Sequence, residues 1–370
     1  MRRTHESNLK PALQPAPFAE RLLAWFDHHG RHDLPWQHPR EPYRVWLAEV
    51  MLQQTQVQTV IPYFTRFITA LPDLASLAEA SEEQVLALWS GLGYYSRARN
   101  LHATAKICLQ RHAGALPTTL DELMALPGIG RSTAGAILAQ AHGLAHAILD
   151  GNVRRVLARW AGIEGWPGDT QIQKQLWALS EQLLPEQRLA DYTQALMDLG
   201  ATVCTRSKPD CDHCPVKADC IALRDGRVAQ LPTSRPRKSI AQRQCLMLLA
   251  RDADGRVLLQ QRSGPGVWQG LWSLPEATDE ARLRHLVRGQ IEVSFRCESL
   301  PSFHHSFSHY RLEITPLLAH EVKARVGIAE TDEGSRWVDG DAWSSLGLPA
   351  PVRRLLILLC HKRYTSRDMI

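Results

Sequence analysis

The sequence predicts a multidomain chain in which an all-α domain is followed by a smaller α+β module, and three observations support this fold class. The 370 residues exceed one ordinary domain, since domains usually hold about 100 to 200 residues. Between residues 18 and 225 apolar residues recur at helical spacing, whereas residues 244–370 contain short apolar runs separated by turn residues, a pattern typical of strands. Residues 226–243, which are rich in arginine and proline, predict a linker between the two.

The composition excludes several classes of protein. The chain is 44% hydrophobic and 22% charged, and no apolar run approaches the ~18 residues of a membrane helix. The basic first residues are followed by polar ones instead of the apolar core of a secretory signal, so we expect a cytoplasmic protein. Residues 1–17, with three prolines, predict a disordered arm. The net charge of +5 is compatible with a polyanionic partner and identifies none.

The first helix of the α domain is predicted from four apolar residues that share one face, Phe18, Leu22, Trp25 and Phe26. In the C-terminal module, residues 245–250 and 257–259 flank turn residues and predict a β-hairpin. Periodicity further predicts a helix over 279–287, a long strand over 310–318 and a terminal helix over 352–359.

A glycine turn is predicted between two helices near residue 130. Thr119 and Glu122 fit a capping box that opens a short helix, and a second helix begins near Ser132. Glycines let the backbone approach a ligand, and a helix N-terminus offers free amides to a phosphate. A purely structural turn would use the same residues, but the flanking helices favour DNA-backbone binding. The residues of this predicted contact are Gly128, Gly130, Arg131 and Ser132.

Two carboxylates are candidates for chemistry. Glu49 interrupts the apolar run 45–52, and partial desolvation there would raise its pKa and suit it to donate a proton. Gln53 and Gln56 lie on the same helical face, so a surface stripe is the alternative and is favoured by this helix alone. Asp150 is placed to cap the helix that follows it, although a capping Asp can also face a developing cation.

Four cysteines within seventeen residues predict a metal centre between residues 204 and 220. Zinc and an iron-sulfur cluster both fit this set, since each is held by four thiolates. Arg206 and Lys208 lie in the first loop of this cysteine segment, where they either present charge to phosphates or are simply solvated. The predicted ligands are Cys204, Cys211, Cys214 and Cys220.

Read in order, these motifs resemble one family closely, the MutY-type adenine DNA glycosylases of the helix-hairpin-helix superfamily. The resemblance spans nearly all of the chain after the N-terminal arm. It rests on the segments 34–36, 46–56, 91–95, 126–134 and 148–153 and on the cysteine segment.

The resemblance implies removal of adenine mispaired with 8-oxoguanine or guanine in duplex DNA, after the base is flipped out of the helix. It implies that Glu49 protonates the adenine and later activates water, and that Asp150 stabilises the oxocarbenium-like sugar. It implies one [4Fe–4S] cluster in the cysteine segment. We also expect a monomer that associates with the nucleoid through DNA and not with membranes.

The resemblance further assigns residues that contact the flipped base and its surroundings. Gln54 and Tyr94 match residues that wedge into the base stack. Ser132 stands where strand-cleaving relatives place a lysine, and a serine cannot form their Schiff base, so we expect a monofunctional enzyme. The residues matching the adenine pocket are Arg31, Leu52, Gln194 and Met197.

The C-terminal module resembles a Nudix domain through residues 257–259 and 270–275. Starting the Nudix pattern at Gly270 reaches Glu276 but then finds His285, Arg288 and Gly289 where metal-binding glutamates belong, so we expect no Mg site. The resemblance implies instead that this module reads the 8-oxoguanine strand. The predicted recognition loop is Phe307, Ser308 and His309.

Three other functions were weighed against this one. An endonuclease III-like glycosylase with lyase activity would lack the Nudix-like module and carry the hairpin lysine. A DNA-lesion binding protein without catalysis would not need both Glu49 and Asp150. A nucleotide pyrophosphohydrolase would need the glutamates that are missing.

Overall fold

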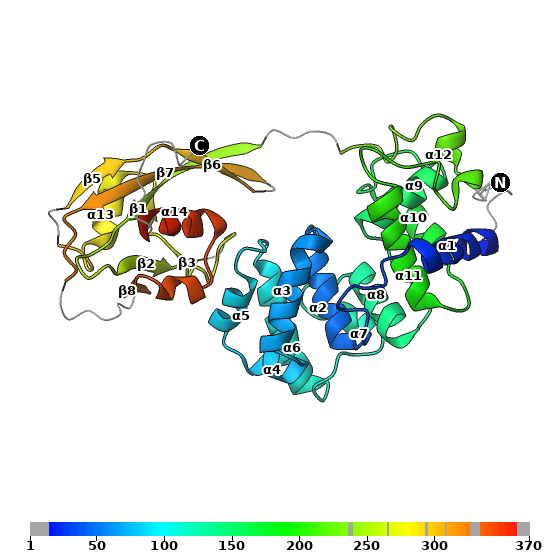
Figure 1. Ribbon diagram of the computed structural model, residues 1–370, viewed down its shortest axis with the longest axis horizontal. Coiled ribbons are helices and arrows are strands. Elements are labelled where there is room, and N and C mark those ends of the chain that lie inside the picture. Colours follow the sequence, from blue (N-terminus) through cyan, green and yellow to red (C-terminus); the bar gives the residue numbers. More distant parts are fainter. Residues whose placement is uncertain are drawn as a thin grey trace, which may run out of the picture. The chain divides into compact units, whose positions relative to one another are not determined.

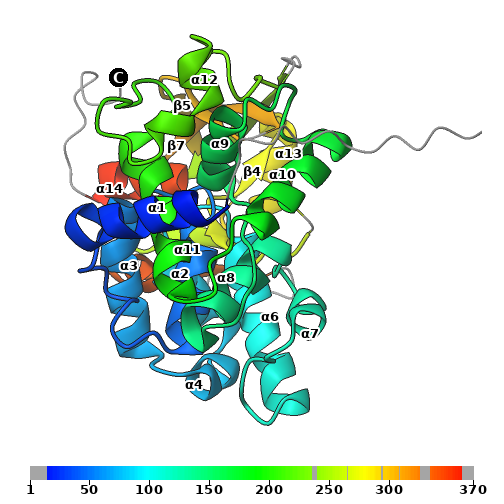
Figure 2. The same cartoon turned by 90° about the vertical axis from the view of Figure 1, so that its right-hand side faces the viewer.

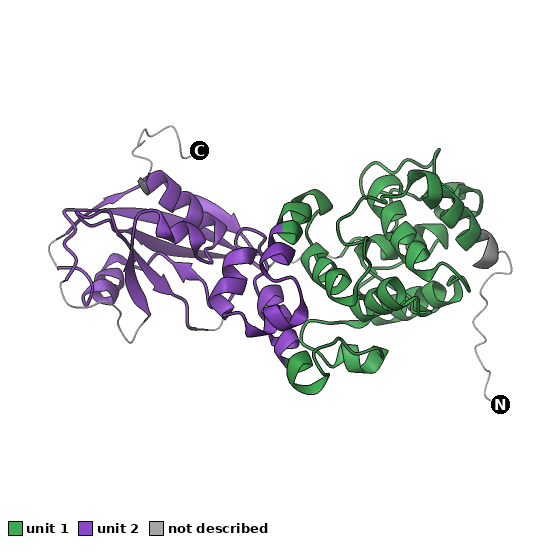
Figure 3. Cartoon of the chain, turned by 60° about the horizontal axis from the view of Figure 1, so that its bottom comes forward, with its two compact units in different colours: residues 1–65, 107–237 green, residues 66–106, 238–370 purple. Residues whose placement is uncertain are grey.

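The computed structural model describes residues 15–235, 240–264, 266–292, 295–307, 309–325 and 334–360. The chain divides into two compact units, one formed by residues 1–65 and 107–237 and the other by residues 66–106 and 238–370 (Figure 3). The second unit therefore joins a helical segment from the first third of the chain to the C-terminal module. No helix in the described ranges is both long and apolar enough to cross a bilayer.

The first unit is helical and is built around α8 (Arg131–His142). This helix packs against α2 (Pro42–Leu52), α7 (Leu120–Met124) and α11 (Leu189–Asp198), which surround it in Figure 2. The other helices of the unit are α1 (Pro15–His29), α9 (Gly151–Trp160), α10 (Thr170–Gln182) and α12 (Ile221–Arg224), with the π-turn Leu199–Val203 and the 3-10 turn Lys217–Asp219.

The predicted apolar face of the first helix is confirmed. Phe18 and Leu22 are fully buried and Phe26 is 1% exposed, in a core shared with α9, α10 and α11, while Trp25 lies partly buried at its margin. The helix begins at Pro15, inside the predicted arm, because a proline is tolerated in the first helical turn, where its missing N–H has no intrahelical partner. Residues 1–14 lie outside the described part.

The glycine hairpin forms where the sequence predicts it. Thr119 caps α7 by accepting a hydrogen bond from the Glu122 amide, and its hydroxyl donates to the Glu122 carboxylate at 2.5 Å. Gly128 has a φ of 77°, a conformation that side chains disfavour, and Gly130 is the N-cap of α8. The turn thus exposes both glycines ahead of the α8 N-terminus.

The chain reverses after α8 and runs back along it toward α9. Gly143 ends α8 in a left-handed conformation with φ 66°. The segment 144–149 then passes so close to α8 that a Cβ at Gly135 would collide with the Ala147 carbonyl oxygen. This close approach fixes where α9 begins, and Asp150 is its N-cap.

The second unit combines helices with two sheets. Its helical part holds α4 (Leu74–Glu79) and α5 (Glu82–Trp89), with parts of α3 (Val57–Ala70) and α6 (Ser96–Arg111). One sheet has the order β4-β1-β7-β5 with β6 also paired to β7, and the other has the order β3-β2-β8. The strands are β1 (Ala241–Leu249), β2 (Val257–Gln261), β3 (Trp272–Ser273), β4 (Glu276–Ala277), β5 (Arg296–Ser299), β6 (Phe303–Ser306), β7 (Tyr310–His320) and β8 (Ser335–Val338).

Helices flank these strands in Figure 1. α13 (Glu280–Val287) packs against β1 and β4, and α14 (Ala350–Cys360) packs against β1; a 3-10 turn, Ala342–Ser345, precedes α14. β1 and β7 pair in parallel over nine residues, whereas the other pairs are antiparallel. The sequence-predicted helix over 279–287, strand over 310–318 and terminal helix over 352–359 are confirmed.

The predicted β-hairpin forms only beside its turn. The Gly255 amide donates to the Asp252 carbonyl, Arg251 and Val257 form an antiparallel bridge, and the Leu258 amide donates to the Ala250 carbonyl. Beyond these residues β1 and β2 belong to different sheets, because both edges of β1 pair with other strands, with β7 along its whole length and with β4 at Leu246 and Met247. β1 also begins at Ala241, within the segment predicted to be a linker.

Substituting Gly135 with alanine should destabilise the first unit. The added methyl group would force apart α8 and the 144–149 segment, and overpacking of this kind costs about 1–3 kcal/mol. Thermal unfolding of Gly135→Ala measures this effect. Gly130→Ala is the comparison variant, because a Cβ at Gly130 would meet nothing within 4 Å. Equal melting temperatures for the two variants would show that the close approach is not a constraint.

Candidate active site

Glu49 lies on α2, within an apolar stretch whose residues Val45 to Ala48 and Val50 to Met51 are buried. Its Oε1 accepts a hydrogen bond of 3.1 Å from Nε2 of Gln140 on α8. Burial raises the pKa of Glu49 to about 7, and the negative charge of Asp150 adds to this effect, while the bond from Gln140 opposes it. Near neutral pH a large fraction of Glu49 therefore carries a proton.

Asp150 stands at the N-terminus of α9 and accepts a hydrogen bond of 2.8 Å from the Val153 amide. Burial raises the pKa of Asp150 as well, but this hydrogen bond and the charges of Arg155 and Arg154 act in the opposite direction. Glu49 has only a neutral amide as its partner. Of the two acids, Asp150 is therefore the one whose anionic form is better stabilised, and Glu49 is the one that holds the proton.

Two hydroxyl groups hold the backbone directly before Asp150. Ser132 Oγ accepts a hydrogen bond of 3.0 Å from the Leu149 amide, and Ser180 Oγ donates one of 2.8 Å to the Ile148 carbonyl. Ser132 thus turns its hydroxyl toward the segment that carries Asp150, a contact that the sequence did not predict. Ser180, on α10, is 2% exposed and was not among the predicted residues.

Arg31 and Gln194, which were predicted to line one pocket, meet on Asp198. Arg31 donates to this carboxylate through its backbone amide at 2.8 Å and through Nε and Nη2 at 3.0 and 2.6 Å. Gln194 Nε2 donates to Asp198 Oδ1 at 2.7 Å. Asp198 is fully buried, and the remaining amide oxygen of Gln194 is buried without a hydrogen-bond partner. Leu52, at the end of α2, and Met197, on α11, are partly buried.

The two predicted wedge residues share an uncommon backbone conformation. Gln54 follows α2 with φ 59°, and Tyr94 precedes α6 with φ 50°. Both are exposed, Tyr94 to 47%. Non-glycine residues with positive φ are uncommon and often mark functional sites, where the surrounding structure maintains the strain.

The residues predicted to contact the DNA backbone differ in how far they already interact with other side chains of the protein. Arg131 forms an ion pair with Glu181 and stacks on the Trp177 ring at 4.1 Å, so part of its charge is balanced within the protein. Arg206 and Lys208 are exposed in the cysteine segment. Gly128 and Gly130 are exposed at the hairpin.

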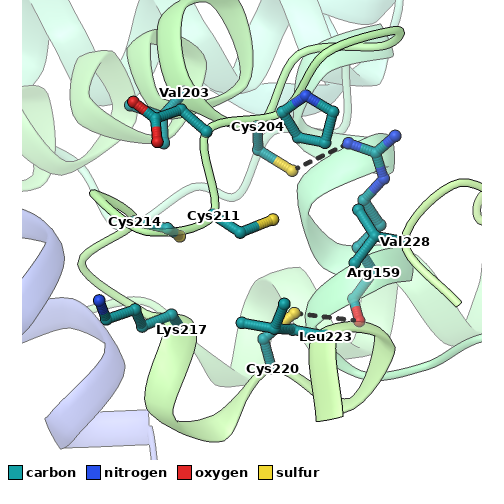
Figure 4. A pocket seen from close by; sticks show the side chains of 11 residues that line it. Arg159, Val203, Cys204, Cys211, Cys214, Lys217, Cys220, Leu223 and Val228 are labelled. Carbon is teal, nitrogen blue, oxygen red and sulfur yellow. Dashed lines mark hydrogen bonds between the residues drawn. The ribbon is translucent and has the colours of Figure 1, made fainter. Parts of the chain in front are cut away.

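The four predicted cysteine ligands line one pocket of about 310 Å³ (Figure 4). Val203, Leu223 and Val228 give the pocket apolar walls. No three His, Cys, Asp or Glu side chains in the described ranges are arranged to hold a single metal ion. Burial raises the pKa of the Cys214 thiol to about 12.

Arg159, in the last turn of α9, lines this cysteine pocket. It is 3% exposed and donates to Cys204 Sγ at 3.4 Å, to the Thr205 carbonyl at 2.7 Å and to the Leu231 carbonyl at 2.8 Å. A buried guanidinium beside thiolates balances negative charge, and four soft ligands in an apolar pocket suit an iron-sulfur cluster. One helix, α9, therefore begins at Asp150 and ends at the cysteine pocket.

In the C-terminal module, the predicted recognition loop joins β6 to β7 beside an aromatic cluster. The Phe307 ring lies 5.2 Å from Trp268, 4.7 Å from His305 and 4.5 Å from Tyr310, and His309 is exposed at the loop. Ser308, the middle residue of the predicted loop, lies outside the described residues.

Two residues of the Nudix pattern form ion pairs. Glu276 pairs with Arg262, and Arg284, also in that pattern, binds Glu280 on the same helix at 2.7 Å.

Three functional contacts were missed by sequence reasoning: Gln140 on Glu49, Asp198 between Arg31 and Gln194, and Arg159 at the cysteines. Each is a polar residue inside an apolar helix face, which was the available signal. The two residues of each contact, Gln140 with Glu49, Arg31 with Asp198 and Arg159 with Cys204, lie 45 to 167 residues apart in the sequence. Periodicity alone therefore does not identify the partner.

Comparisons with known proteins agree with this geometry. The model of the HhH-GPD superfamily of base excision DNA repair proteins matches residues 47–182, and the NUDIX domain model matches residues 246–358. A solved structure of a thermostable thymine-DNA glycosylase covers 57% of this chain and 97% of its own, with a TM-score of 0.53 and 26% identity. The predicted fold class is confirmed, and the helical part of the chain, which includes residues 66–106 of the second unit, carries the fold of a base-excision DNA glycosylase.

Relatives that align with most of the chain define its family more precisely than the fold does. The adenine DNA glycosylase of Buchnera aphidicola subsp. Acyrthosiphon pisum (strain APS) is 36% identical over 92% of this chain and 96% of the relative. Those of Mus musculus and Homo sapiens are 35% and 33% identical, over 95% and 91% of this chain and 79% and 73% of the relatives. The chain belongs to the adenine DNA glycosylase family and is a DNA glycosylase of base excision repair.

The pKa of Glu49 predicts a pH-dependent stability. Because the folded-state pKa, about 7, exceeds the ordinary 4.5, stability due to protonated Glu49 is full below about pH 4.5 and is lost as pH rises through 7. Glu49→Gln stays neutral at every pH. Between pH 4.5 and pH 8 the unmodified protein should therefore lose on the order of 3 kcal/mol of unfolding free energy relative to this variant. Denaturant unfolding across this pH range measures the difference.

The matched control is Glu20→Gln, which neutralises an exposed glutamate of α1. Its unfolding curves should follow those of the unmodified protein at every pH. A Glu49→Gln variant that also follows them would show that Glu49 titrates as a solvated carboxylate.

Proposed function

We propose that this enzyme hydrolyses the N-glycosidic bond of adenine mispaired with 8-oxoguanine or guanine in duplex DNA, without cleaving the strand. The observation that carries this is a pair of partly buried carboxylates, Glu49 with its pKa raised to about 7 and Asp150 with its anion better stabilised by its partners. Such a pair divides acid and electrostatic roles between two groups, as in glycoside hydrolysis.

Glu49 acts first as the general acid. Its proton passes from the carboxyl oxygen to a ring nitrogen of the flipped adenine, which turns the base into a neutral leaving group as the glycosidic bond breaks. The resulting carboxylate then takes a proton from the water that attacks the sugar. Gln140 holds Oε1, which fixes the orientation of the carboxyl group for both steps.

Asp150 stabilises the positive charge that develops on the sugar. Its anion is fixed by the α9 N-terminus before the reaction, so it needs no reorganisation as charge develops. The hydroxyls of Ser132 and Ser180 restrain the backbone that carries it. Ser132 has no amine with which to attack the sugar, which supports a monofunctional reaction.

An acceptor in the predicted adenine pocket suits this base. Among the described residues the buried amide oxygen of Gln194 has no hydrogen-bond partner, and adenine presents an exocyclic amine that donates hydrogen bonds. Pairing an otherwise unsatisfied acceptor removes a cost of about 1–3 kcal/mol, which favours a base with a donor at that position. The Arg31–Asp198 pair holds the Gln194 amide nitrogen and thereby its orientation.

The C-terminal module contributes by reading the base opposite the adenine. Phe307 belongs to the aromatic cluster and His309 is exposed beside it, and aromatic side chains are suited to stack on a base. Tyr94 and Gln54 act as wedges in the base stack, and Gly128, Gly130, Arg131, Ser132, Arg206 and Lys208 lie along the DNA backbone.

The cysteine pocket is proposed to hold one [4Fe–4S] cluster through Cys204, Cys211, Cys214 and Cys220. When bound, the cluster supplies four covalent ties that close the 204–220 segment. Arg159 balances its negative charge and connects the segment to α9. The chain acts on DNA as a monomer in the cytoplasm, at the nucleoid.

A duplex with a single adenine opposite 8-oxoguanine tests the reaction. Base release should appear as strand cleavage only after alkali, and Asp150→Asn should abolish it while duplex binding is retained. The matched control is Asp169→Asn, which changes another capping aspartate, at α10, and should keep full turnover. Strand cleavage without alkali would indicate a lyase, and binding without any base release would contradict the enzymatic proposal.

The cofactor is tested by visible absorption of the purified protein. A broad visible band is expected for an iron-sulfur cluster and not for zinc, whose filled d shell gives no colour. Cys214→Ser should lose the band, whereas Cys108→Ser, a buried cysteine outside the pocket, should keep it. A colourless protein that contains zinc would overturn the cluster.

A further inference from the structure

We propose that the C-terminal module holds the loop that carries Tyr94 in its strained conformation, through Ser90 and Tyr95, and thereby couples reading of the opposite base to insertion of the wedge. This inference rests on the proposed roles of Tyr94 and of the C-terminal module. All of the residues involved belong to the second compact unit.

The loop between α5 and α6 has a positive φ at three residues. Gly91 has φ 99°, Gly93 has φ 76° and Tyr94 has φ 50°. The two glycines adopt these angles without steric cost, but Tyr94 does not. A non-glycine residue keeps such a conformation only where its surroundings impose it.

Two side chains at the ends of this loop bind the backbone carbonyl of Leu348 in the C-terminal module. Ser90 Oγ donates to the Leu348 carbonyl at 3.1 Å and accepts from the Leu348 amide at 3.2 Å. Tyr95 Oη donates to the same carbonyl at 2.8 Å and accepts from the Gly91 amide at 3.1 Å. Ser90 is 7% exposed and Tyr95 is 4% exposed, so these bonds form away from water.

The helices on either side of the loop are attached to the same module. Glu83 on α5 accepts hydrogen bonds from Trp272 Nε1 at 2.9 Å and from Arg336 at 3.1 Å, and the Arg336 guanidinium stacks on the Trp272 ring. Arg99 on α6 donates to the Gln269 carbonyl at 2.7 Å. The loop therefore has little freedom to shift without the module.

Tyr94 itself projects from this support. Its ring is exposed, and the Arg97 guanidinium lies 5.4 Å from the ring centre and donates to the Gly93 carbonyl at 3.2 Å. Removing the Tyr95 hydroxyl leaves the ring packing in place but frees one end of the loop. The contact of the module with 8-oxoguanine would then no longer set the position of Tyr94.

The test uses the full-length protein and a duplex that holds 2′-fluoro-2′-deoxyadenosine, which resists cleavage, opposite 8-oxoguanine. 2-Aminopurine stacked beside the 8-oxoguanine reports wedge insertion, because its fluorescence rises when it is unstacked. Tyr95→Phe should lower this rise, and Tyr94→Ala should abolish it. Tyr95→Phe should also lower the preference for A:8-oxoguanine over A:guanine in single-turnover base release by about five- to tenfold, the effect of one or two buried hydrogen bonds.

Tyr192→Phe is the matched control, because it removes a buried tyrosine hydroxyl that has no hydrogen-bond partner, and it should match the unmodified protein. Ser90→Ala should reproduce the Tyr95→Phe result from the other end of the loop. Unchanged preference and fluorescence in both loop variants would overturn the coupling. Equal losses on both duplexes with a lowered melting temperature would also overturn it, since they would indicate a structural role only.

Different results would contradict the proposed function and this inference. If the unmodified protein released adenine with no preference for 8-oxoguanine, the reading role of the C-terminal module would be contradicted, and the coupling with it. If the unmodified protein shows the preference and Tyr95→Phe retains it, only the coupling is contradicted.

Discussion

Glu49 and Asp150 are two partly buried carboxyl groups, and the charge of Asp150 raises the pKa of Glu49. Desolvation and mutual repulsion make two anions unfavourable there, so the pair holds one proton near neutral pH. The local partners decide which acid carries it, since the α9 N-terminus and nearby arginines favour the Asp150 anion. The proposed chemistry needs this unequal division, and much of the helical unit maintains it.

Helices α8 and α9 hold Glu49 and Asp150 in place. α8 supplies Gln140 to Glu49, Ser132 to the backbone before Asp150, and the space at Gly135 through which that backbone passes. α9 extends from Asp150 to the cysteine pocket, where Arg159 binds the carbonyls of the 204–220 segment. A bound cluster would therefore stiffen the far end of the helix that Asp150 caps.

The sequence pointed to Glu49 as an acid in an apolar run and to Asp150 by its position before a helix, because both signals are local. The contacts of Asp198 and Arg159 were not predicted, since they join segments far apart in the sequence. For the same reason, the β1–β2 hairpin is shorter than predicted: pairing of β1 with β7 and β4 limits it to the residues beside the turn. The grouping of residues 66–106 with the C-terminal module likewise depends on contacts remote in sequence, such as those of Ser90 and Tyr95 with Leu348.

The central claim is that burial keeps Glu49 protonated near pH 7, and a carboxyl titration tests it most directly. In protein labelled with ¹³C at the glutamate side-chain carboxyl, the resonance that disappears in Glu49→Gln identifies Glu49. The account predicts that this resonance titrates with a midpoint near pH 7. A midpoint near the ordinary value of 4.5 would mean that Glu49 is an anion at neutral pH, which would contradict its role as the proton donor.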